Sequence, residues 1–142
     1  MSDAFEDERE RIREQKRREL LEQHGEVADT NSAGDQQFDT PVKVQGGDHL
    51  DKLVSENRVV LADCYADWCG PCQMMEPAIQ AVAAETDAVV AKIDVDALQP
   101  LAAQLGVQGV PTLVLYVDGS PVERLVGAQS KGALESLIRQ HT

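Results

Sequence analysis

The chain has 142 residues, of which 42% are apolar, enough for one packed domain with some length to spare. Its formal net charge is -12, so the surface should repel nucleic acid and anionic membranes, and we expect neither as a partner. The three cysteines include one C-x-x-C motif, but there is no second pair and the three histidines are scattered, which argues against a zinc site. We expect no metal and no bound cofactor.

Residues 1–40 differ in composition from the rest of the chain. Asp3 can cap a helix that ends near Gly25, but large apolar residues are too few for a core-facing stripe. Within the first 24 positions, six basic residues are interleaved with eight acidic ones, so a solvated charged helix is a better interpretation than a nucleic-acid site. Polar residues over 26–40 indicate a flexible linker. We predict a charged extension over 1–40 and a folded domain over 41–142.

Strand and helix patterns alternate from residue 41 onward. Aliphatic runs predict strands over 42–45, 59–65, 89–94, 113–117 and 122–126. Apolar residues at helical spacing predict helices over 48–55, 69–86, 98–105 and 130–141. Asp118-Gly119 between the last two strands is typical of a hairpin. The order predicts an α/β fold: a mixed sheet with parallel crossovers and an antiparallel hairpin, covered by helices on both faces.

The C-x-x-C motif lies where a buried strand ends and a helix begins. At such a junction, free backbone N–H groups and the positive end of the helix point at the first sulfur and favour its thiolate. The same geometry should expose the sulfur of Cys69 and place Cys72 one turn further on, close enough to form a disulfide. We therefore expect Cys69 to be the nucleophile of a redox pair, with Pro71 in the first helical turn.

Asp63 lies inside the apolar strand that precedes the motif. A carboxylate that is ionised and unpaired there is costly, so it tends to stay protonated and can exchange protons near neutral pH. The alternative is that Asp63 pairs with a base, and Lys92 in the next strand is the obvious one; both can hold at once. Cys64 should point to the opposite sheet face, where a buried inert thiol is a better interpretation than a third redox-active one.

Pro111 precedes an apolar strand within Gly109-Val110-Pro111-Thr112. Because proline cannot donate a hydrogen bond to a strand ladder, we explain Pro111 by a turn that brings backbone close to another site. The pattern leaves open whether its peptide bond is cis or trans.

The motif and its surroundings resemble the thioredoxin family. Trp68-Cys69-Gly70-Pro71-Cys72 looks like the active-site motif of that family, and further matches follow at similar spacing over 41–142. They include Asp63, Pro77, Ala91-Lys92-Ile93-Asp94, Gly109-Val110-Pro111-Thr112, Asp118-Gly119 and Val126-Gly127. The resemblance implies a thioredoxin fold and a protein-disulfide reductase, in which Cys69 attacks a target disulfide and Cys72 resolves the mixed disulfide. It also implies disulfide-containing protein substrates and a thioredoxin reductase that restores the dithiol.

The resemblance implies roles for single residues as well. Asp63 matches a buried aspartate that assists deprotonation of Cys72, Lys92 matches its lysine neighbour, and Pro111 matches a cis-proline facing the disulfide. The implied substrate-binding surface consists of Trp68, Gly70, Pro71, Val110, Pro111 and Gly127.

Residues 1–40 lie outside the family pattern, and the other departures from it lie next to the motif. Cys64 and Tyr65 stand where two large aromatics are usual, and Gln73 replaces a common basic residue. We expect these differences to affect partner choice and to leave the dithiol chemistry intact.

Two other functions stay open from sequence. A disulfide oxidase or isomerase usually carries histidine between its cysteines and works in secreted compartments, whereas this chain has Gly70-Pro71. A binding module without turnover would not need both cysteines. The charged N-terminal stretch lacks the apolar segment of a signal peptide, so we expect a cytoplasmic protein, where structural disulfides are rare. We expect a monomer.

Overall fold

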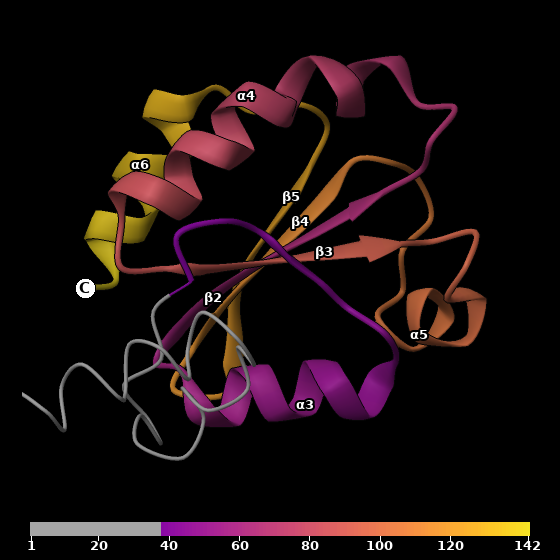
Figure 1. Cartoon of the computed structure of the whole chain (residues 1–142), viewed down its shortest axis with the longest axis horizontal. Coiled ribbons are helices and arrows are strands. Elements are labelled where there is room, and N and C mark those ends of the chain that lie inside the picture. The colour runs from indigo at the N-terminus through magenta and orange to yellow at the C-terminus, as the bar shows by residue number, and fades with distance from the viewer. Residues whose placement is uncertain (1–37) are drawn as a thin grey trace, which may run out of the picture. The chain divides into compact units, whose positions relative to one another are not determined.

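A five-stranded sheet forms the centre of the computed structural model, which describes residues 38–142 (Figure 1). The strands are β1 (Val42–Lys43), β2 (Val59–Tyr65), β3 (Val89–Asp94), β4 (Thr112–Val117) and β5 (Ser120–Val126). They lie in the order β1-β3-β2-β4-β5. β1 and β2 pair in parallel with β3, whereas β4 pairs antiparallel with β2 and β5. The predicted mixed sheet is therefore confirmed.

Helices cover both faces of this sheet, as predicted. They are α3 (Gly47–Glu56), α4 (Gly70–Glu85), α5 (Gln99–Gln104) and α6 (Lys131–Gln140). Figure 1 shows α4 and α6 together on one face and α3 and α5 on the other. No helix in this described part of the chain is long and apolar enough to cross a membrane.

The sheet has a separate apolar core on each face, because side chains alternate along a strand. All residues of β2 except the last are buried. Val60 of β2 packs in one cluster with Leu53 of α3, and Leu61 packs in the other with Ile79 of α4. A polar side chain in β2 is therefore buried in an apolar core on either face of the sheet. Burial of the Asp63 carboxyl costs free energy for this reason.

The observed elements begin and end within two residues of the predicted ones. The largest differences concern β1, which is shorter, and β5, which begins earlier and includes Pro121. β5 tolerates a proline because it is an edge strand. Asp118 and Gly119 between β4 and β5 both have positive φ, 54° and 85°, as a tight hairpin requires. The helix predicted before residue 25 and most of the predicted linker lie outside the described residues.

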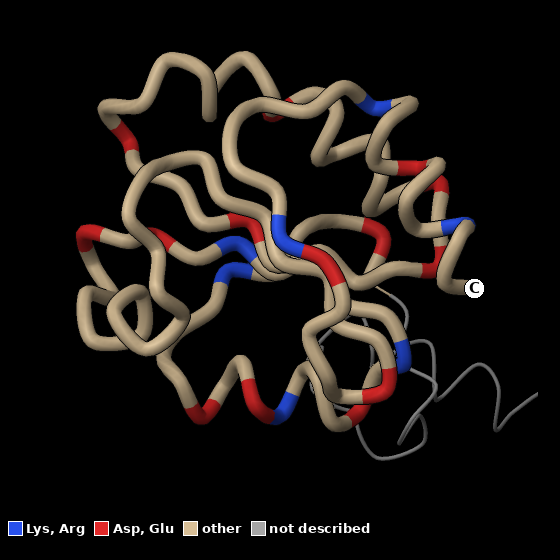
Figure 2. Tube along the Cα trace, turned by 180° about the vertical axis from the view of Figure 1, so that it is seen from behind, with Lys and Arg blue, Asp and Glu red and all other residues tan. Residues whose placement is uncertain are grey.

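Acidic side chains outnumber basic ones throughout the described residues. Positions 38–142 hold fourteen acidic and seven basic residues, a formal net charge of -7. Figure 2 shows the acidic positions spread over loops and helices on many sides of the trace rather than in a single patch. The domain is therefore subject to self-repulsion, which salt screens.

Candidate active site

The two cysteines of the C-x-x-C motif form a disulfide at the junction of β2 and α4. Cys69 is the N-cap residue of α4, Pro71 and Cys72 lie in its first turn, and the two cysteine Cα atoms are 5.3 Å apart. The backbone N–H of Cys72 donates a hydrogen bond to Cys69 Sγ at 3.1 Å. The start of the helix thus directs a donor at the Cys69 sulfur, which favours negative charge on that atom.

The expectation that the first sulfur is exposed is wrong for this disulfide form. Only 3% of Cys69 and 4% of Cys72 are accessible to solvent. Both pack in a small cluster with Ala66, and Val110 packs against it from the loop before β4. A local pattern could not show this cover, because it comes from a segment about forty positions away in the sequence. The hydrogen bond at the N-cap therefore distinguishes the two sulfur atoms, whereas burial does not.

Asp63 is buried as predicted, with 2% of its surface exposed. Within the described part of the chain, its Oδ1 has no hydrogen-bond partner. The residue shares the α4 side of the sheet with Leu61, two positions earlier in β2. Burial raises the pKa of Asp63 from 3.8 to about 6; the ammonium of Lys92 opposes this rise and the carboxylate of Glu76 adds to it. A carboxyl group with such a pKa can take up and release a proton near neutral pH.

Lys92 does not pair with Asp63, so that alternative is wrong for this structure. The two residues are partners in the register of β2 and β3, but Lys92 Nζ donates to Glu76 Oε2 at 2.5 Å. The same ammonium lies 4.4 Å from the ring centroid of Tyr65. The reason is desolvation: the Glu76 side chain is 37% exposed, so its charge costs less to maintain than one on buried Asp63. Glu76 was not predicted, although it follows Cys72 by four positions and so lies one helical turn further along α4.

The exposed Trp68 is held by an aspartate that sequence reasoning also missed. Trp68 is 71% exposed, and its Nε1 donates to Asp96 Oδ2 at 2.8 Å. Asp94 Oδ1 in turn accepts from the backbone N–H groups of Asp96 and Ala97 at 2.9 and 3.2 Å. The strand order could have indicated both aspartates. They follow or end β3, which is parallel to β2, so the carboxyl ends of the two strands lie at the same sheet edge as the motif.

The remaining predicted residues lie in the loop before β4 and directly after β5. The Val110–Pro111 peptide bond is cis, as the resemblance implied. The carbonyl of Pro111 accepts from the Gly127 N–H at 2.8 Å, so the loop before β4 lies next to the end of β5. Gly127 has a φ of 100°, which favours glycine. Trp68 and Val110 line a mostly apolar groove of about 330 Å³ that runs along α5.

Cys64 is buried and free, as predicted. It packs in the cluster on the α3 side of the sheet, opposite Asp63. Burial, with a smaller effect from the charge of Asp63, raises the pKa of the Cys64 thiol to about 12. Its thiolate is therefore scarce at neutral pH, and Cys64 is a packing residue rather than a third redox group.

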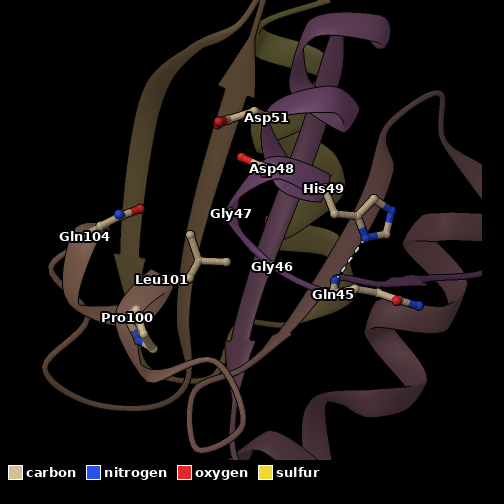
Figure 3. A pocket seen from close by; sticks show the side chains of 9 residues that line it. All are labelled: Gln45, Gly46, Gly47, Asp48, His49, Asp51, Pro100, Leu101 and Gln104. Carbon is tan, nitrogen blue, oxygen red and sulfur yellow. Dashed lines mark hydrogen bonds between the residues drawn. The ribbon is translucent and has the colours of Figure 1, made fainter.

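A larger pocket, of about 570 Å³, lies between the start of α3 and α5 and shares no residue with the groove or the disulfide (Figure 3). It is lined by Gln45, Gly46, Gly47, Asp48, His49, Asp51, Pro100, Leu101 and Gln104. Figure 3 shows the ring of His49 engaged by its neighbour: Nδ1 accepts from the backbone N–H of Gln45 at 3.0 Å. Over residues 38–142, no group of three or more His, Cys, Asp or Glu side chains is arranged to hold a metal ion.

Comparison with known proteins points to one family. The family model described as Thioredoxin matches residues 41–140. A curated thioredoxin from Mycobacterium tuberculosis is 42% identical over 102 residues, which is 70% of this chain and 88% of that protein. A bifunctional thioredoxin reductase/thioredoxin from Mycobacterium leprae is 36% identical over 110 residues, 76% of this chain and 23% of that protein. The solved structure of a mutant thioredoxin from Halobacterium salinarum is 57% identical, covers 75% of this chain and 95% of that chain, and superposes with a TM-score of 0.73.

Proposed function

The chain belongs to the thioredoxin family and is a thiol-disulfide oxidoreductase, and we propose that Cys69 and Cys72 carry its reduction of disulfides in other proteins. The observation that carries this proposal is the disulfide at the start of α4, with the Cys69 sulfur as N-cap acceptor. A sulfur in that position is the one on which a thiolate costs least. Cys69 is therefore the attacking residue and Cys72 the resolving one.

In the first step, the Cys69 thiolate of the reduced protein attacks one sulfur of a target disulfide. A bond forms between Cys69 Sγ and that sulfur, and the target S–S bond breaks. The electron pair leaves with the second target sulfur, which takes a proton from solvent. The product is a mixed disulfide between Cys69 and the target.

In the second step, Cys72 resolves the mixed disulfide. Its thiol must lose a proton first, and we assign Asp63 as the group that accepts it. Asp63 is buried on the α4 side of the sheet, its Oδ1 has no partner, and its pKa of about 6 suits proton exchange near neutral pH. The Cys72 thiolate then attacks Cys69 Sγ, the intramolecular disulfide forms, and the target leaves as a thiolate. The target has gained two electrons, and the protein has lost two.

The substrate surface consists of the residues that surround the disulfide in this proposal. Trp68 is exposed and held by Asp96, and with Val110 it lines the apolar groove along α5. Gly70 and Pro71 lie between the two cysteines, and Pro111 and Gly127 are joined by a backbone hydrogen bond. An extended target segment placed here would bury apolar surface next to the sulfur atoms. Specificity then resides in loops rather than in the dithiol itself.

The oxidised protein needs a source of electrons, and we propose a thioredoxin reductase. The relative from Mycobacterium leprae supports this, because it is named as a bifunctional thioredoxin reductase/thioredoxin. We place the cycle in the cytoplasm, where target thiols are kept reduced. The protein acts as a monomer in this proposal, and the negative charge of the described domain speaks against nucleic acid or an anionic membrane as a partner.

Trapping of the mixed disulfide tests the assignment of the two cysteines. Reduced Cys72→Ser protein, freed of small thiols and mixed with insulin, should form a covalent adduct whose peptide map places the bond at Cys69. The matched Cys69→Ser variant should form little adduct under the same conditions. An adduct that forms equally well on the Cys69→Ser variant would show that Cys72 or Cys64 attacks instead.

A further inference from the structure

Two oppositely charged groups act on the buried carboxyl of Asp63 from different elements. The charge of Lys92 acts on it from β3, and the charge of Glu76 acts on it from α4. From β4, the residue paired with Asp63 is Leu113, which is apolar and buried. On its own strand, the titratable side chains coupled to Asp63 are Cys64 and Tyr65. Burial has the largest effect on the pKa of Asp63, and Lys92 and Glu76 are the charged side chains that change that pKa further.

The Lys92 ammonium is committed to Glu76. Its Nζ donates to Glu76 Oε2 and lies over the ring of Tyr65, and only 18% of the Lys92 side chain is exposed. Asp63, its partner across the two strands, has an oxygen, Oδ1, to which no group among residues 38–142 donates a hydrogen bond. An ammonium has three donors, but the carboxylate that Lys92 bonds is Glu76, although Asp63 is its partner across the strands.

We propose that Glu76 is a positioning residue for Asp63: it holds the ammonium of Lys92 away from the buried carboxyl and so prevents an ion pair that would keep that carboxyl ionised. Glu76 acts in two ways in this arrangement. Its own negative charge disfavours a second negative charge on Asp63, and its bond to Lys92 occupies the cation that would otherwise favour that charge. Both effects keep Asp63 protonated to higher pH. The inference rests on the proposed function of Asp63 only for its relevance to catalysis.

The test is the titration of the Asp63 side-chain carboxyl carbon by carbon-13 NMR in the oxidised full-length protein. Glu76→Gln keeps the size of the side chain and removes its charge, so the Asp63 titration should move to lower pH by about one pH unit. Lys92→Met should move it the other way. Glu85→Gln is the matched control, because Glu85 lies on the same helix and pairs with Lys131 at 2.8 Å. It should leave the Asp63 titration where it is in the parent.

The double variant Glu76→Gln/Lys92→Met separates the effect that Glu76 has through Lys92 from the direct effect of its own charge on Asp63. If Glu76 acts through Lys92, removal of its charge should shift the Asp63 titration less than half as far when Lys92 is absent. An equal shift in both backgrounds would overturn the proposal, as would an Asp63 titration that Glu76→Gln leaves unchanged. Because the titration involves no turnover, it decides the role of Glu76 even if Asp63→Asn reduces insulin as fast as the parent, a result that would remove only Asp63 from the mechanism.

Discussion

Asp63→Asn should make the oxidised protein more stable at neutral pH, and the gain should shrink as the pH falls. Asparagine has nearly the same shape as aspartate but cannot ionise. In the parent, the buried carboxyl must either give up its charge or keep it without a donor on Oδ1. The substitution removes the free-energy cost of ionising this carboxyl in the folded protein, and the pH dependence of the stability gain measures that cost.

The magnitude follows from the pKa of Asp63, which burial raises from 3.8 to about 6. The folded protein binds this proton more tightly than the unfolded chain, so ionisation destabilises the fold progressively as pH rises from about 4 to about 6 and by a constant amount above that. At about 1.4 kcal/mol per pKa unit, the cost is about 3 kcal/mol at pH 7.5 and about 1 kcal/mol at pH 4.5. The stability gain of Asp63→Asn should therefore be about 2 kcal/mol greater at pH 7.5.

Urea unfolding of oxidised parent and variant at the two pH values measures this difference. The cost of burying the asparagine amide is the same at both pH values, so it cancels when the two gains are subtracted. Asp87→Asn, which removes an exposed carboxyl from the turn before β3, is the matched control. A gain that is equal at pH 4.5 and pH 7.5 would refute the reasoning, because the buried carboxyl would then carry no ionisation cost.

Three other changes have outcomes that the structure sets. Asp96→Ala removes the hydrogen bond that holds Trp68, so KM for insulin should rise by up to about tenfold with kcat little changed. An unaltered KM would mean that substrate binding does not depend on this hydrogen bond. The melting temperature should be higher in 2 M than in 0.1 M KCl, because salt screens the net charge of -7 on the described domain, and a lower midpoint in 2 M KCl would contradict this. A chain that begins at Gln37 should melt and reduce insulin like the full-length chain, since residues 41–142 contain the whole predicted domain; loss of either property would make the N-terminal residues part of the fold.

Sequence patterns were sufficient for the elements of the fold because each has a strong local signal. β2 is a continuous aliphatic run, α4 repeats apolar residues at helical spacing, and the Asp118-Gly119 turn requires two positive φ values that aspartate and glycine tolerate. These signals involve neighbours in the chain. The mixed sheet with helices on both faces then followed from the alternation of strands and helices.

The contacts that refine the site were not predictable in the same way, because they join distant segments. The cover over Cys69 comes from the Val110 loop, and the choice of Glu76 over Asp63 as partner for Lys92 depends on how deeply each carboxyl is buried. Burial is a property of the packed domain. A strand position alone could say that Asp63 is buried, but it could not say that Lys92 would pair with Glu76 instead of Asp63.

Reduction of insulin with dithiothreitol as electron donor measures the proposed activity itself. Catalytic amounts of the parent protein should accelerate insulin precipitation well above the donor alone, and Cys64→Ser should do so equally because its thiol is buried and inert. Cys69→Ser should give no acceleration. A parent protein that fails to accelerate the reaction, or a Cys69→Ser variant that retains the activity, would contradict the assignment of this chain as a disulfide reductase that attacks through Cys69.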